Sequence, residues 1–216
     1  MRILGFDSSA KTASVAVFDS EAEDGLLGQY FQNCGLTHSR TLLPMAEDVL
    51  KNLGLTLGDI DLLACSRGPG SFTGVRIGVS TVKGLAFADS KPVCGVSTLQ
   101  AMAYNGITAH EGSVICCAMD ARRDQFYNAL FIIRDGVPVR LCEDRAIGTQ
   151  KLIDDIENLN KPVFLVGDGA RLCYNALNDF KLRVVLAPAP MRYQTAWGVC
   201  MAALREQAVP AGELLP

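Results

Sequence analysis

The sequence predicts an α/β fold made of two similar lobes, and two observations lead to this expectation. Apolar segments of strand length alternate with segments in which apolar residues recur at helical spacing, as in sheets covered by helices. The order of the segments also repeats. An apolar strand ending in Asp7 is followed by a second strand, and an apolar strand ending in Asp120 is followed in the same way. We therefore expect an internal duplication.

The first lobe is expected over residues 1–100. Its strands are predicted from short apolar or alternating runs bounded by turn residues, at 2–6, 12–18, 26–32, 62–66 and 92–96. Helical spacing predicts one helix between Thr37 and Gly54 and two more at 73–88 and 98–104. Pro44 lies inside the first helix and should kink it or restrict it to its first turns.

The second lobe is expected over residues 101–190. The same reasoning places its strands at 114–119, 125–133, 137–142, 163–166 and 183–186. Its helices are expected at 149–158 and 170–179. A last amphipathic helix, within 193–209, should pack back on the first lobe.

Composition and charge exclude several classes of protein. The 216 residues carry a net charge of −3, so nothing predicts a basic face, and any RNA contact is expected only through a partner. The eight cysteines form no C-x-x-C pair and are interpreted as free thiols in a reducing cytosol. Two histidines argue against a zinc site. Without a long apolar segment, the protein is expected to be cytoplasmic, with no membrane contact.

The strongest motif is the glycine-rich segment Arg67–Gly78, which a strand enters and a helix leaves. Such a turn offers backbone N–H groups and a positive helix end to an anion. Val75 and Arg76 stand where a Walker A loop needs Lys and Ser/Thr, and Thr73 breaks the dinucleotide fingerprint. A turn required only for tight packing is the competing interpretation.

The helix after this turn contains Gly74, Gly78 and Gly84, each of which costs a helix about 0.8–1 kcal/mol relative to alanine. Gly74 and Gly78 share a face, so another segment could approach closely there. That segment belongs either to this chain or to a partner. If it belongs to a partner, leucine at either position should abolish docking while the monomer stays folded.

Other candidate residues each have two interpretations. Asp7 and Asp120 would hold Mg²⁺ in a two-lobe nucleotide-binding fold, or would simply form turns. The turn at 167–169 could approach a nucleotide or join a strand to a helix. Arg122 and Arg123 are either a solvated pair or a small anion contact.

Several segments together resemble the TsaB (YeaZ) family. They are Ile3–Ser9, His38–Pro44, Arg67–Gly78, Lys83–Ala86, Gly95–Leu99 and Met119–Arg123. The resemblance is strong up to about residue 135 and continues weakly to the last helix. It implies an actin-like ATPase (sugar kinase/Hsp70/actin) fold of two ribonuclease-H-like lobes. Family members usually continue past a proline into a Tyr-Leu-Arg stretch, whereas this sequence ends at Leu214-Leu215-Pro216, so it does not show what that stretch contacts.

The resemblance also implies a function. The family works with TsaD, a larger catalytic paralogue, and with TsaE, to transfer threonylcarbamoyl to adenosine 37 of tRNA. The implied role is a non-catalytic scaffold, with no cofactor required and weak ATP or ADP binding left open. The scaffold should form a heterodimer with TsaD and a homodimer when alone, and should meet tRNA only through the complex.

The residues implied for these roles fall into two groups. The partner interface is expected at residues of the first two long helices: His38, Leu42, Leu43, Met45, Val49, Phe72, Gly74, Val75, Gly78, Val79 and Val82. A degenerate nucleotide cleft is expected at residues of the strand ends and glycine turns: Asp7, Ser8, Gly68, Gly70, Ser71, Asp120, Gly167 and Gly169.

One departure from the catalytic paralogue is informative. That paralogue carries a His-x-x-x-His metal pair, and Thr98 and Met102 stand at the corresponding positions here. A hydroxyl and a thioether are poor ligands for a catalytic metal ion. The sequence therefore predicts no catalytic metal. Two hypotheses compete with the scaffold: an independent ATPase or kinase of the same fold, and a peptidase, for which neither a metal pair nor a serine or cysteine relay is found.

Overall fold

The computed structural model describes residues 1–35, 37–177 and 183–216. The chain divides into two compact units, Met1–Ala101 with Gln194–Pro216 and Met102–Tyr193. The sequence predicted a lobe limit at 100/101 and a return to the first lobe at 193. We describe each unit by itself.

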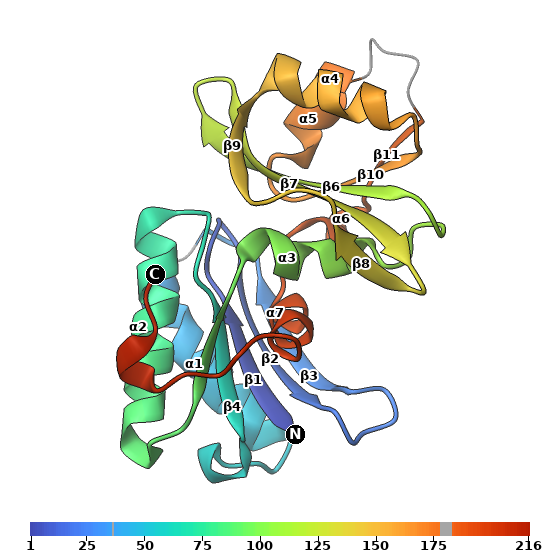
Figure 1. Cartoon of the computed structure of the whole chain (residues 1–216). Helices are drawn as coiled ribbons and strands as arrows, with labels where there is room; N and C mark the ends of the chain where they lie inside the picture. The colour runs from blue at the N-terminus through green and yellow to red at the C-terminus, as the bar shows by residue number, and fades with distance from the viewer. Residues whose placement is uncertain (36, 178–182) are drawn as a thin grey trace. The chain divides into compact units, whose positions relative to one another are not determined.

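Unit 1 is built on a five-stranded sheet (Figure 1). Its strands are β1 (Arg2–Asp7), β2 (Ala13–Asp19), β3 (Leu26–Gln32), β4 (Leu62–Ser66) and β5 (Val93–Val96). Their order in the sheet is β3-β2-β1-β4-β5. The first three strands pair antiparallel, and β4 and β5 continue the sheet in parallel with β1. All five predicted strands are confirmed within one residue at each end.

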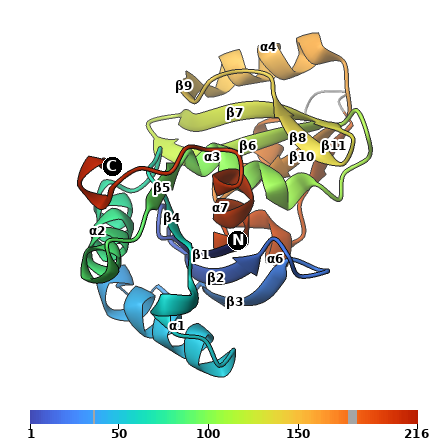
Figure 2. The ribbon, with the colours of Figure 1, turned by 60° about the horizontal axis from the view of Figure 1, so that its bottom comes forward.

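Helices cover both faces of this sheet (Figure 2). Helices α1 (His38–Asn52) and α2 (Phe72–Asp89) pack on one face, where Leu4 and Phe6 of β1 enter a common core with them. Helix α7 (Ala196–Ala203) packs on the other face, so close to β1 that a Cβ at Gly5 would lie 2.6 Å from Cys200 Sγ. The alternation of side chains along β1 therefore assigns one set of residues to each layer.

Unit 2 repeats the same topology. Its strands are β6 (Val114–Arg122), β7 (Gln125–Arg134), β8 (Val137–Arg140), β9 (Arg145–Gly148), β10 (Val163–Val166) and β11 (Val184–Leu186). The order β11-β10-β6-β7-β8 matches that of unit 1, with the opening strand again between an antiparallel hairpin and a parallel pair. Helices α4 (Thr149–Leu159) and α5 (Ala170–Leu177) close the core. The duplication predicted from the sequence is confirmed.

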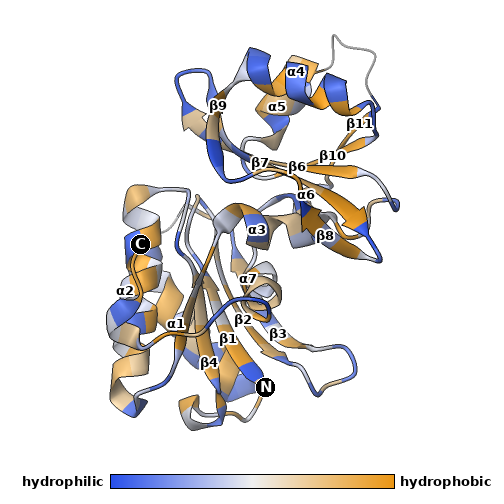
Figure 3. Cartoon of the chain, in the orientation of Figure 1, coloured by the Kyte–Doolittle hydropathy of each residue, from blue (hydrophilic) through white to orange (hydrophobic). Residues whose placement is uncertain are grey.

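The remaining helical segments are short. They are α3 (Thr98–Ala103), α6 (Ala189–Arg192) and 3-10 turns at Leu57–Asp59, Tyr104–Gly106 and Ala211–Glu213. Figure 3 shows apolar residues running along the strands of both sheets. Within the described residues, no helix has the length and apolar character needed to cross a membrane.

Some elements differ from the prediction. Helix α1 continues for two turns beyond the exposed Pro44, so its restriction to the first turns is wrong. Helix α7 is shorter than 193–209, because Val209 instead pairs antiparallel with Val93 and a proline follows it. Strand β9 was not predicted, since its four residues are too short and mixed to show a pattern. The end of the helix predicted at 170–179 lies partly outside the described residues.

Candidate functional site

Asp7 is the centre of the most distinctive polar cluster in unit 1. It ends β1 and is only 1% exposed. Its Oδ1 accepts hydrogen bonds from the backbone N–H of Ser9 at 3.1 Å and from the Ser9 hydroxyl at 3.0 Å. Its Oδ2 accepts one from the Ser66 hydroxyl at 2.5 Å. Ser66 ends the parallel neighbour β4, so the topology brings the two residues to the same edge of the sheet.

Burial makes the Asp7 carboxyl group a weaker acid than usual. Desolvation raises the pKa of Asp7, and the hydrogen bonds from Ser66 and Ser9 and the nearby His38 oppose that rise only in part. The His38 ring donates from Nε2 to the Ala10 carbonyl at 2.7 Å. Both carboxylate oxygens of Asp7 are therefore occupied by protein donors, and a metal ion would have to displace them.

The glycine-rich turn packs directly on the residues that follow Asp7. The Ser71 N–H donates to the Ser9 carbonyl at 2.7 Å, and the Ser8 hydroxyl donates to the Gly74 carbonyl at 2.9 Å. A Cβ would lie 2.4 Å from the Ser9 carbonyl oxygen at Gly70 and 2.1 Å from the Ser8 carbonyl oxygen at Gly74. Both glycines are thus required for backbone-to-backbone packing.

This packing also explains Gly78, where a Cβ would lie 2.7 Å from the Ser8 hydroxyl oxygen. The close approach predicted at Gly74 and Gly78 is real, but the approaching segment belongs to this chain. The expectation that leucine at either position leaves the monomer folded is therefore corrected, because a larger side chain would collide with the β1–β2 turn. Ser71 caps α2, accepting a hydrogen bond from the Gly74 N–H at 3.2 Å, and Gly68 has a φ of +116°.

Unit 2 contains a counterpart of this arrangement. The partly exposed Asp120, near the end of β6, accepts a hydrogen bond from the Arg122 N–H at 2.8 Å. The Gly169 N–H donates to the Ala118 carbonyl at 3.0 Å. A Cβ at Gly167, whose φ is +112°, would lie 2.1 Å from that same oxygen. These glycines also serve close packing on the opening strand of their unit.

Most residues expected at the partner interface are buried in the core of unit 1. They are no more than 6% exposed and comprise Leu42, Met45, Val49, Val75, Val79 and Val82. In the isolated chain they pack on the sheet, so they present no surface, and their assignment to the interface is corrected. The helical periodicity that identified them is the mark of a core-facing stripe.

The outward surface of the two helices carries two of the expected interface residues, Leu43 and Phe72, together with Phe87. Leu43 of α1 is 42% exposed, and Phe72 and Phe87 of α2 are 70% and 86% exposed. The Arg76 guanidinium lies over the Phe72 ring, 3.7 Å from its centroid. Phe87 was missed from the sequence; it could have been found as a large apolar residue outside the buried stripe.

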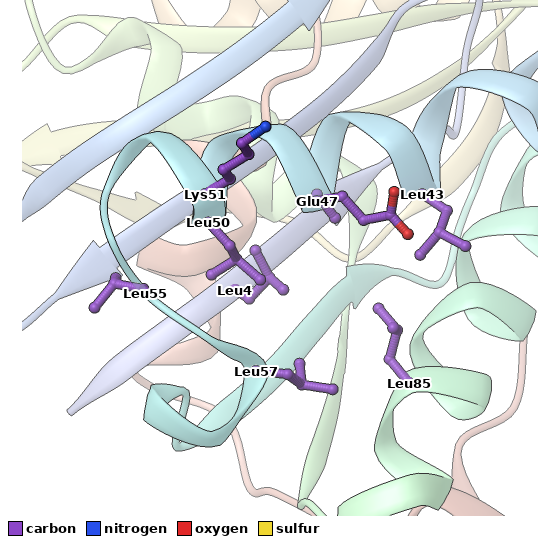
Figure 4. A pocket seen from close by; sticks show the side chains of 9 residues that line it. Leu4, Leu43, Glu47, Leu50, Lys51, Leu55, Leu57 and Leu85 are labelled. Atoms are coloured by element: carbon purple, nitrogen blue, oxygen red, sulfur yellow. The ribbon is translucent and has the colours of Figure 1, made fainter.

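A groove lies between the two helices (Figure 4). It has a volume of about 440 Å³. Its walls are mainly leucines of α1, α2 and the loop after α1, namely Leu43, Leu50, Leu55, Leu57 and Leu85. Glu47 and Lys51 of α1 also line it. The exposed Leu43 lines this groove, whereas Phe72 and Phe87 line separate hollows.

Side chains that could together hold a metal ion are not gathered in the described part of the chain. No group of three or more His, Cys, Asp or Glu side chains there could hold a metal ion. Thr98 and Met102 are fully buried. Burial also raises the pKa of the thiols of Cys65 and Cys200 to about 12, which keeps them protonated and poorly nucleophilic.

Comparisons with known proteins point to one family. The family model for TsaD, tRNA N6-adenosine threonylcarbamoyltransferase, matches residues 32–171. The tRNA threonylcarbamoyladenosine biosynthesis protein TsaB of Escherichia coli (strain K12) is 41% identical over 127 residues, which cover 59% of this chain and about half (53%) of that protein. TsaB of Haemophilus influenzae is 33% identical over 178 residues, covering 78% of this chain and 72% of that protein.

Solved structures agree with this result. YeaZ from Pseudomonas aeruginosa superposes with a TM-score of 0.82 at 27% identity, covering all of this chain and 98% of that one. An inorganic polyphosphate/ATP-glucomannokinase from Arthrobacter superposes with a TM-score of 0.51 at 12% identity, covering 94% and 97% of the two chains. The second likeness concerns the fold alone, which is the actin-like ATPase fold shared with sugar kinases.

Proposed function

This chain belongs to the TsaB (YeaZ) family and takes part in tRNA threonylcarbamoyladenosine biosynthesis, and we propose that it does so as a non-catalytic scaffold. In this proposal it binds a TsaD-type transferase, together with TsaE, and supports threonylcarbamoyl transfer to adenosine 37 of tRNA. It requires no cofactor of its own, and any ATP or ADP binding is weak. Without its partner it pairs with a second copy.

The exposed face of α1 and α2 carries the docking part of the proposal. Phe72, Phe87 and Leu43 are large apolar side chains held in water at a cost that burial against a partner would remove. Aromatic residues and arginine dominate the energetics of protein interfaces, and Arg76 already stacks on Phe72. The groove of about 440 Å³ that Leu43 helps to line offers a recess for a partner side chain.

The polar cluster supports the non-catalytic part. Asp7 is buried and its oxygens are engaged by Ser9 and Ser66, whereas a kinase of this fold needs carboxylates open to magnesium. The glycine turn fills the space beside Ser8 and Ser9 with its own backbone. The protonated, buried thiols offer no substitute nucleophile.

Light scattering coupled to size-exclusion chromatography tests the docking claim. We expect a homodimer for the purified chain alone and a one-to-one heterodimer after mixing with the TsaD-type transferase. An unchanged mass in the mixture would reject the scaffold, and ATP hydrolysis by the chain alone would favour the independent ATPase. As a companion, Asp7→Asn should leave tRNA modification by the assembled complex nearly unchanged, and a large loss would restore a nucleotide role for Asp7.

A further inference from the structure

The tip of the β6–β7 hairpin has an unusual backbone for the residues it contains. Arg122, Arg123 and Asp124 have φ angles of +67°, +52° and +57°. This left-handed region is one that residues other than glycine, asparagine and aspartate rarely occupy. The strand register also shifts between Asp120 and Arg122. Two successive arginines are therefore held in a conformation that their side chains disfavour.

The other hairpin of the same sheet provides an internal comparison. Its tip is Asp135-Gly136, with φ angles of +51° and +71°, and this pair is among those preferred for two-residue hairpins. Unit 2 thus contains one tip whose residues suit the turn and one that holds two arginines at positive φ. The arginines are kept at the β6–β7 tip despite the conformation, and strain of this kind concentrates at functional sites.

The charges at the tip are unevenly compensated. Asp120 accepts the Arg122 N–H at 2.8 Å and lies 3.5 Å from the Arg122 guanidinium. The Asp124 carboxylate accepts a hydrogen bond from the Thr149 hydroxyl at 2.5 Å, at the start of α4. Arg123 is exposed and has no ion pair among the residues that the structure describes. Both carboxylates are engaged, so Arg123 presents an available cation.

We propose that Arg123, supported by Arg122, contacts a phosphodiester group of the RNA substrate. This proposal rests on the proposed function, which supplies one extended polyanion, tRNA. A guanidinium fits phosphate oxygens with two parallel hydrogen bonds, and a short, rigid hairpin fixes its position. The chain as a whole has a net charge of −3, so it does not attract RNA in general. A local contact of this kind instead fixes the position of the tRNA on the protein.

Salt-dependent tRNA binding tests this inference. Fluorescence anisotropy with labelled tRNA is measured over a range of NaCl concentrations, for the chain alone and for its mixture with the TsaD-type transferase and TsaE. Arg123→Ala should weaken binding roughly tenfold at low salt. It should also reduce the slope of log affinity against log salt by about one. Arg123→Lys should keep most of the slope but lose part of the affinity.

Two further variants separate binding from folding. Arg134 is an exposed arginine at the other end of β7, where the β7–β8 hairpin begins. Arg134→Ala should change neither the tRNA affinity nor its salt slope. Arg123→Gly suits the positive φ, so its unfolding midpoint should equal or exceed that of the parent while its tRNA affinity falls as in Arg123→Ala.

Three outcomes would overturn the inference. The first is equal affinity and slope for the parent and Arg123→Ala, and the second is no measurable tRNA binding in either sample. The third is a loss of heterodimer mass in light scattering with unchanged salt slope, which would make the tip a contact for an acidic protein surface. A parent chain that binds tRNA but does not join the transferase would instead reject the scaffold and leave this contact standing.

Discussion

Asp7 combines burial with hydrogen bonds from three donor groups of its own chain, and its pKa shows which effect dominates. Its pKa is raised above the ordinary value of 3.8 because the loss of hydration outweighs the donors. At pH values between the ordinary pKa, which applies to the unfolded chain, and the raised pKa of the folded chain, Asp7 keeps a proton in the folded chain and releases it in the unfolded chain. The contribution of Asp7 to stability is therefore present at low pH and is lost as the pH rises through this range.

Asp7→Asn tests this sign, since an amide of similar size does not titrate. The unfolding free energy of the variant minus that of the parent should increase as the pH rises from 4 to 7. The slope cannot exceed about 1.4 kcal/mol per pH unit, the limit for a single proton. Urea unfolding at several pH values measures the difference. A difference that is flat or falls with rising pH would show that the Ser66 and Ser9 hydrogen bonds dominate instead.

Two glycines of α2 provide a matched pair. Gly74→Ala should lower the unfolding free energy by about 1–3 kcal/mol, because the new Cβ would collide with the Ser8 carbonyl. Gly84→Ala should raise it by about 0.5–1 kcal/mol, since nothing lies within 4 Å and alanine favours the helix. Thermal or urea unfolding of both variants distinguishes the sites. Equal effects at the two positions would contradict the close packing at Gly74.

At the scale of elements, the strands were predicted more accurately than the roles of the helices. A period-2 or continuous apolar run marks a strand whatever packs against it, which is why β1 to β5 were placed almost correctly. The buried stripe of α1 and α2 was visible too, but it was assigned to a partner. The sequence does not tell whether an apolar helix face packs on the chain's own sheet or on a partner protein. Leu42 and Val82 were compatible with both.

The same limit applies to the glycine turn. The sequence identified Gly70, Gly74 and Gly78 as positions of close approach, but the approaching residues, Ser8 and Ser9, lie more than 60 positions away. Their identity depends on β1 and β4 being parallel neighbours, with α2 following β4. Long-range pairing of this kind leaves no local signal. Asp7 was found as a strand end, whereas its burial and its bond to Ser66 required the structure.

Phe72→Ala tests whether the outward face of α2 is the docking surface. The side chain is 70% exposed, so the unfolding free energy should change by less than about 1 kcal/mol, the value of an exposed contact with Arg76. Affinity for the TsaD-type transferase should fall by roughly ten- to hundredfold, as for an aromatic interface residue. Isothermal titration calorimetry measures it.

The control for this variant lies in the other unit. Leu172→Ala removes a 52% exposed apolar residue from α5 and should leave transferase binding unchanged. If both variants bind equally well, the docking surface does not include Phe72. If both weaken binding to the same extent, the interface is not specific to the α1–α2 face.

For the molecule as a whole, the duplication explains why the two units resemble each other. The units differ in one respect, which is the continuity of the chain within them. Each unit has an opening strand with Asp at or near its end, a hairpin, and a glycine turn packed on that strand or on the residues that follow it. Unit 2 is a single continuous segment, Met102–Tyr193, whereas unit 1 is assembled from Met1–Ala101 and Gln194–Pro216. The repeat could be recognised from the order of elements alone, because it does not depend on long-range contacts.

The discontinuity of unit 1 leads to a prediction about fragments. Helix α7 covers one face of the unit 1 sheet, where the Ala196 N–H donates to the Ser14 hydroxyl at 3.0 Å and Cys200 packs against Gly5. Without α7 that face, including Ile3 and Ala16, would be left in water. We expect fragment 102–193 to unfold cooperatively in urea and fragment 1–101 to lack a cooperative transition.

A permuted chain distinguishes a missing helix from a general weakness of the fragment. Placing 194–216 before 1–101, joined by a long Gly/Ser linker, returns α7 to the same chain and should restore a cooperative transition. Replacing Cys200 by Arg in this permutant should abolish it again, since a charged side chain cannot be accommodated beside Gly5 without an unpaired buried charge. A cooperative transition in fragment 1–101 alone, with the same midpoint as the permutant, would show that the five-stranded sheet and its two outer helices suffice, and that α7 contributes to something other than the folding of unit 1.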